Sequence, residues 1–136
     1  MLHTAAVIWM LAQTLWVGAH ASYLLIFMPA LQQIGLAPLL LSEVHAVVRP
    51  GLLVLTLMAL GIQILALWRS KPLMQWITEL RGLLVVMAVA LCLLLLVAQS
   101  MQLTAAPWAR LAYGGLLSMG LLLLIQPLPE APERSL

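Results

Sequence analysis

Four long apolar segments dominate this 136-residue chain. Only 7% of its residues are charged and 65% are hydrophobic, whereas charged residues make up roughly a quarter of a typical soluble domain. A bilayer core about 30 Å thick needs roughly 20 apolar residues per helix. The segments that meet this requirement are 5–28, 50–68, 82–98 and 107–126. We therefore predict an all-α membrane protein, with one four-helix transmembrane domain over residues 1–126.

The connections between these segments are short and contain proline. Residues 37–45 predict a brief interfacial helix in the first loop, with Pro38 in its first turn. Pro50 is expected to break or kink the chain after that helix. The sequence from Pro72 onward predicts a second amphipathic helix, in the second loop. The proline-rich residues 127–136 cannot continue a helix and predict a flexible tail.

The cations beside the segments predict how the chain is oriented. With four spans, both termini lie on the same side of the membrane as the second loop. Four cations share that side: Arg69, Lys71, Arg81 and Arg134. Arg49 and Arg110 fall on the other side. Because cytoplasmic loops carry the excess of Lys and Arg, both termini are predicted to be cytoplasmic.

One face of the first segment carries aromatic and polar side chains. Alternating spacings of four and three residues place six of them together: Trp9, Gln13, Trp16, His20, Tyr23 and Phe27. Polar groups at membrane depth are costly toward lipid, so they are expected to point into a bundle and bond to neighbouring helices. The polar bundle interior predicted in this way comprises Gln13, Trp16, His20, Thr56, Gln63 and Gln99.

The opposite face of the first segment carries small side chains. Thr14, Gly18 and Ser22 recur every four residues there. Gly114 and Ser118 repeat the pattern in the fourth segment. Small residues at this spacing let helix backbones approach closely in lipid. We therefore predict that these five residues are helix-packing positions, with Gly18 at the closest contact made by the first segment.

The residues needed for common catalytic sites are missing. The chain has no aspartate, and its glutamates all fall outside the apolar segments: Glu43, Glu79, Glu130 and Glu133. A pair of carboxylates for acid–base catalysis or a Ser-His-Asp triad therefore cannot be assembled within the membrane. Cys92 is the only cysteine, which excludes an intramolecular disulfide. We assign no catalytic residue and expect a protein that is not an enzyme.

His20 is the one candidate for cofactor binding. A neutral imidazole in a membrane can ligate haem iron or a metal, relay protons, contact a substrate such as a quinone, or bond to a neighbouring helix. No second histidine stands three or four residues away. We therefore expect no metal site and no cofactor, and favour a structural hydrogen bond for His20.

The first forty residues resemble a known family. Residues 11–18 (LAQTLWVG), 27–31 (FMPAL) and 34–40 (IGLAPLL) resemble the opening half of small bacterial inner-membrane proteins grouped as domain of unknown function 4149. That family is akin to transmembrane protein 205, with a more distant likeness to copper-resistance protein D and to the bacterial haem-containing protoporphyrinogen oxidase. The resemblance implies four spans in the bacterial inner membrane and no assigned activity. Where those haem and copper relatives often carry a histidine, this chain has Trp9 or Ile8.

These features favour a protein that acts through contacts within the membrane. The expected partners are the lipid bilayer and another membrane protein, or a second copy of the chain. Nucleic acid is excluded as a partner because the net charge of +2 includes no basic cluster. We predict a small accessory or assembly subunit of a larger inner-membrane complex. The alternatives are a small homo-oligomeric permease and, third, a haem- or quinone-linked membrane enzyme.

Overall fold

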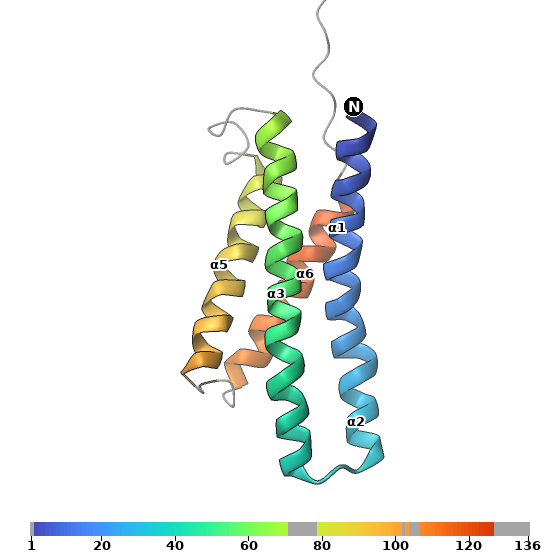
Figure 1. Ribbon diagram of the computed structural model, residues 1–136, viewed down its shortest axis with the longest axis vertical. Helices are drawn as coiled ribbons and strands as arrows, with labels where there is room; N and C mark the ends of the chain where they lie inside the picture. The colour runs from blue at the N-terminus through green and yellow to red at the C-terminus, as the bar shows by residue number, and fades with distance from the viewer. Residues whose placement is uncertain (1, 71–78, 102, 104–106, 127–136) are drawn as a thin grey trace, which may run out of the picture.

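The described part of the chain is a bundle of four long helices. The computed structural model describes residues 2–70, 79–101, 103 and 107–126. All regular secondary structure in these residues is helical, and four of the helices are long and apolar enough to cross a membrane. Figure 1 shows these helices lying side by side. The predicted all-α fold with four membrane-spanning helices is therefore confirmed.

The four crossings form a closed ring around one core. In chain order the elements are α1 (Leu2–Ser22), the π-helix η1 (Tyr23–Phe27), α2 (Met28–Ile34), α3 (Pro38–Ser70), α5 (Leu80–Ser100) and α6 (Pro107–Ile125). Helix α1 packs against α3 and α6, and α5 packs against the same two helices. Each crossing therefore has two neighbours and one outer face.

The first crossing is longer than predicted and is widened at one point. Apolar length predicted a helix over 5–28, but the helical path continues through η1 and α2 to Ile34. In η1 the Met28 N–H donates to the Tyr23 carbonyl oxygen, five residues earlier. This widening lies just before Pro29, whose ring would clash with a carbonyl one turn earlier in a regular α-helix.

The first connection is a tight turn rather than a loop with its own helix. Gly35 ends α2 with φ of 69°, a left-handed conformation that glycine adopts without strain. Pro38 then begins α3, which runs without interruption past Pro50. The separate interfacial helix over 37–45 and the break at Pro50 were wrong. A proline removes only one helical hydrogen bond, and α3 makes side-chain contacts on both sides of it: Arg49 bonds to Tyr23, and Thr56 lies against His20.

The last two crossings begin and end close to the predicted positions. Helix α5 extends the predicted segment 82–98 by two residues at each end, and α6 matches 107–126 to within one residue. Most of the predicted second-loop helix, residues 71–78, lies outside the described residues, as does the predicted tail 127–136.

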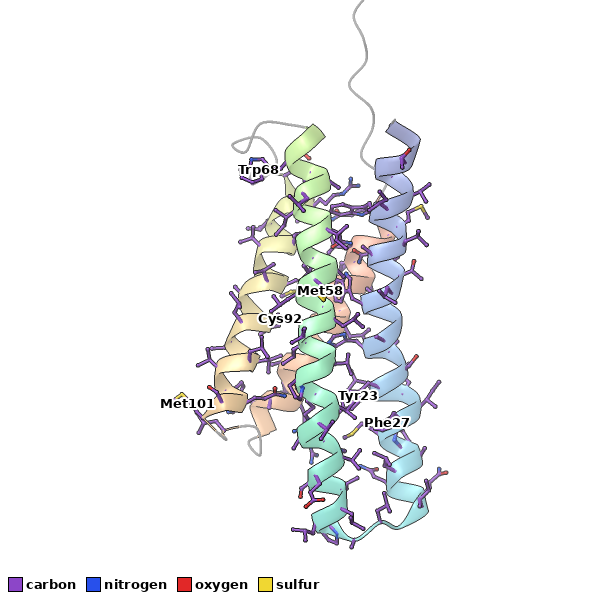
Figure 2. The ribbon with its side chains drawn as sticks, viewed as in Figure 1. Tyr23, Phe27, Met58, Trp68, Cys92 and Met101 are labelled. Atoms are coloured by element: carbon purple, nitrogen blue, oxygen red, sulfur yellow. The ribbon has the colours of Figure 1, made fainter. Side chains whose placement is uncertain are left out.

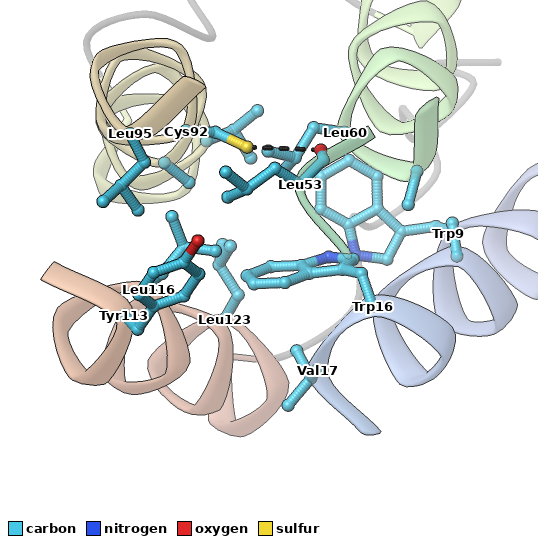
Figure 3. Packing of buried hydrophobic residues seen from close by; sticks show 14 of the residues in the cluster. Trp9, Trp16, Val17, Leu53, Leu60, Cys92, Leu95, Tyr113, Leu116 and Leu123 are labelled. Carbon is cyan, nitrogen blue, oxygen red and sulfur yellow. Dashed lines mark hydrogen bonds between the residues drawn. The ribbon is translucent and has the colours of Figure 1, made fainter. Parts of the chain in front are cut away.

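The same spacing of buried residues lines all four helices. Alternate steps of three and four residues connect the buried positions of each helix, as in coiled-coil packing. They are Trp9, Gln13, Trp16, His20 and Tyr23 in α1 and η1; Leu53, Thr56, Leu60, Gln63 and Leu67 in α3; Val85, Ala88, Cys92 and Leu95 in α5; and Ala109, Tyr113, Leu116, Gly120 and Leu123 in α6. Figure 3 shows apolar members of this set meeting between the helices.

Candidate functional site

The predicted polar interior lies where the helices meet. Five of its six residues are buried: Gln13, Trp16, His20, Thr56 and Gln63. Gln99 is only half-buried. Phe27, the last residue of the stripe in the first segment, is 37% exposed, because η1 adds a residue per turn and rotates the positions after Tyr23 away from the interior.

Two glutamine side chains form a hydrogen-bonded network across three helices. Gln63 Nε2 of α3 donates to Gln13 Oε1 of α1 over 2.5 Å. Gln13 Nε2 in turn donates to the Gly120 carbonyl oxygen of α6 over 2.9 Å. Gln63 Oε1 is buried without a partner in the described part of the chain. The network therefore connects α1 to two neighbouring helices, and both polar atoms of the Gln13 side-chain amide have a partner.

His20 has one bonded ring nitrogen and one free ring nitrogen. Its Nδ1 lies 3.0 Å from the Trp16 carbonyl oxygen, which can only accept. Nδ1 also lies 3.5 Å from Thr56 Oγ1, whose own hydrogen goes to the Leu52 carbonyl oxygen at 2.8 Å. Both contacts require a hydrogen on Nδ1, so neutral His20 carries its lone pair on Nε2. That Nε2 is buried without a partner among the described residues.

Aromatic and cationic side chains cluster at the end of the bundle where α5 ends and α6 begins. Arg49 Nε of α3 donates to Tyr23 Oη over 3.1 Å, and the Tyr23 ring lies edge-on to His45 at 6.2 Å. Tyr113 of α6 is 6.3 Å from the Tyr23 ring. Gln99 Nε2 donates to Tyr113 Oη over 3.1 Å. Figure 2 shows Tyr23 between α1 and α3 in this part of the molecule.

The small-residue positions do not form the helix contacts predicted for them. Thr14, Gly18 and Ser22 are all exposed on the outer face of α1, and a Cβ added at Gly18 would have no atom within 4 Å. The same holds for Gly114, while Ser118 is exposed. Only one face of α1 can point to its neighbours, and the aromatic and polar stripe occupies it. The prediction that Gly18 makes the closest contact within the chain was therefore wrong.

The closest approach involves Gly120 instead. A Cβ at Gly120 would lie 2.5 Å from Val17 Cγ2 and 2.7 Å from the Trp16 ring. Neither this glycine nor Tyr113 was predicted from the sequence as a packing position. The spacing of four and three from Ala109 through Tyr113 to Gly120, the same as in the first segment, was the signal that could have revealed both.

Cys92 lies in the core and has a local bonding role. Its thiol donates to the Leu53 carbonyl oxygen over 3.4 Å, the dashed contact in Figure 3. Cys92 is fully buried between α5 and α3. It is therefore shielded from reagents in solution. Within the described residues, no three His, Cys, Asp or Glu side chains are grouped to hold a metal ion.

A small cavity of about 80 Å³ lies at the opposite end of the bundle. Its lining includes Gln13 of the glutamine network and Arg81. The Arg81 guanidinium lies 5.8 Å from the centre of the Trp9 ring, a distance suited to a cation–π contact. Water or a small polar group fits this space, which adjoins the charged end of α5.

The fold and the polar interior define a helical multi-pass membrane protein. Comparison of the chain with protein-family models, with curated protein sequences and with solved structures finds no match.

Proposed function

We propose that this chain is a small accessory or assembly subunit of a larger complex in a bacterial inner membrane, with both termini in the cytoplasm. The observation that supports this proposal is a pair of apolar helix ends that projects from the bundle. Helix α2 and residues 38–48 of α3 form this projecting hairpin, which Figure 1 shows beyond the ends of α5 and α6. It provides a surface that the helices of the described residues do not cover.

The helix lengths explain why the hairpin projects. Helix α3 has 33 residues and α5 has 21, which correspond to about 50 Å and about 32 Å at about 1.5 Å per residue. The length of α5 fits a bilayer core of about 30 Å. Trp68 is 60% exposed at one end of the bundle, and Trp108 is 38% exposed at the other, as is typical of residues at a membrane–water interface. A bilayer placed between them leaves about 18 Å of α3 outside its core.

The projecting hairpin has large apolar side chains on its surface. Ile34 is 69% exposed, Leu39 73% and Val47 75%. Contiguous apolar surface outside the bilayer is costly in water and marks sites where another protein binds. The Thr14, Gly18 and Ser22 face of α1 is also uncovered, which leaves room for a second helix contact inside the membrane.

Charge placed on the projecting hairpin is expected to release the partner. We expect Leu39→Glu/Val47→Glu to abolish co-purification of a second polypeptide in gentle detergent. Both positions are exposed, so the free energy of unfolding of the isolated chain should change by only about 0.5 kcal/mol per site. Native gel electrophoresis and mass spectrometry measure the complex, and thermal melting measures stability.

The matched control is Gln32→Glu/Gln33→Glu, which adds the same charge at two exposed polar positions of α2. This variant should retain the partner. A complex that survives Leu39→Glu/Val47→Glu would contradict the proposal. A wild-type preparation that contains only copies of this chain would favour the homo-oligomeric alternative instead.

The proposed orientation makes a labelling prediction. Cysteine introduced at Ser42, on the projecting hairpin, should react with a membrane-impermeant thiol reagent in intact cells, whereas cysteine at Ser70 should not. Buried Cys92 contributes little background. Permeabilised cells, in which both positions should react, are the control. Labelling at Ser70 alone in intact cells would reverse the orientation.

A further inference from the structure

We propose that Arg49, Arg110 and His45 bind the phosphate group of an anionic membrane lipid, at the base of the projecting hairpin. The site lies at the base of the hairpin, which contributes His45, and it does not include the exposed apolar side chains Ile34, Leu39 and Val47. It combines two cations with a buried imidazole on α3 and α6.

The two arginines bring positive charge that no carboxylate of the described residues neutralises. Arg49 and Arg110 both lie close enough to His45 to act on it electrostatically. In the described part of the chain, neither guanidinium forms an ion pair with a carboxylate. Phosphate oxygens are strong acceptors for such groups, and arginine donates to them with two parallel N–H bonds.

Arg49 is held in place before any ligand binds. Its Nε donates to Tyr23 Oη, which leaves the two terminal NH₂ groups free of side-chain partners among the described residues. The Tyr23 side chain is itself buried and stacks on Phe27 at 6.0 Å between ring centres. A fixed guanidinium loses less conformational freedom on binding than a mobile one.

His45 supplies an independent sign that a ligand belongs here. Its side chain is only 8% exposed, and its Nδ1 has no hydrogen-bond partner within the described residues. A buried polar nitrogen left unpaired is costly. With its hydrogen on Nδ1, the imidazole can donate to a phosphate oxygen beside the two arginines.

The depth of the site favours a lipid as the source of the phosphate. Arg110 lies in the first turn of α6, two residues after the interfacial Trp108. Leu111, the next residue, is 78% exposed on the outer surface, where it can contact acyl chains. A lipid seated here would place its headgroup on the cations and its chains along α6.

The test is native mass spectrometry of the full chain in neutral detergent, with phosphatidylglycerol or phosphatidylcholine of identical acyl chains. We expect the wild type to bind phosphatidylglycerol more tightly. Arg49→Gln and Arg110→Gln should each weaken that binding about fivefold, whereas Arg49→Lys should retain part of it. Arg81→Gln, which removes one cation at the opposite end of the bundle, should leave this binding unchanged. Tyr23→Phe should weaken it without altering the charge, because Arg49 is no longer held.

Several results would overturn the proposal. Equal binding of the two lipids would do so. Arg81→Gln would also do so if it weakened phosphatidylglycerol binding as much as Arg49→Gln or Arg110→Gln does. Competition by inorganic phosphate or glycerophosphate at the same concentrations would show that the ligand is a free phosphate and not a lipid. Displacement of the lipid by an acidic protein partner would assign the cations to that partner. If Arg49→Gln fails to fold, the exposed Arg110→Gln gives the same test, with thermal melting as the check on folding.

Discussion

Replacing Gly120 by alanine is expected to lower the free energy of unfolding by about 1–3 kcal/mol, the usual cost of overpacking a core. The added methyl group would lie 2.5 Å from Val17 Cγ2 and 2.7 Å from the Trp16 ring. Trp16 is fully buried, so its ring cannot move aside without displacing other core residues. The contact between α1 and α6 should therefore weaken, and the Gln13 bond to the Gly120 carbonyl oxygen with it.

Unfolding in detergent, followed by circular dichroism, measures this effect. Gly114→Ala is the matched control, because it lies on the same helix and its added Cβ would have nothing within 4 Å. We expect Gly114→Ala and Gly18→Ala to leave stability unchanged or slightly higher, since alanine favours helix more than glycine does. If Gly120→Ala is as stable as Gly114→Ala, the close approach of α6 to α1 is wrong.

The Gln13 and Gln63 pair should show strong non-additivity. Gln63→Met keeps the side-chain shape but leaves Gln13 Oε1 buried without its donor, at an expected cost of about 1–3 kcal/mol. Gln13→Met similarly removes the acceptor of Gln63 Nε2. The double variant replaces both amides with apolar groups and should be much less destabilised than the sum of the two single variants.

A double-mutant cycle measured by the same unfolding method tests this expectation. Coupling of about 0.5–2 kcal/mol would place the hydrogen bond in the folded state, although such bonds in membrane bundles often fall at the low end. Strictly additive single variants would show that the two amides do not interact. Ser100→Ala is a suitable control, because its hydroxyl is exposed and bonds only to its own helix.

The membrane class and the inward face of the first crossing were predictable from the sequence. Runs of about 20 apolar residues with few charges can be satisfied only by helices that bond their own backbone groups in lipid. The stripe from Trp9 to Tyr23 was predictable because polar groups are costly toward lipid and helical spacing sorts them onto one face. Burial of Thr56 and Gln63 follows from the same rule.

Helix ends and helix contacts depended on the tertiary structure. Pro50 predicts an interruption locally, but both helices continue beyond the bilayer thickness: the first crossing runs to Ile34, and α3 runs from Pro38 to Ser70. The projecting hairpin results from this continuation. The hydropathy of each segment taken alone cannot predict the projecting hairpin, because hydropathy carries no information about the neighbouring helix.

Which glycine lies at the close helix contact also depended on the tertiary structure. Gly18 and Gly120 are equally small, and both lie in apolar segments. Only Gly120 faces the ring of Trp16, which needs space that a side chain at that position would fill. The sequence by itself determined four spans and a polar face on the first. Which glycine is in contact, and which cations meet near His45, depended on how four separate helices pack, because local patterns carry no information about the partner across the interface.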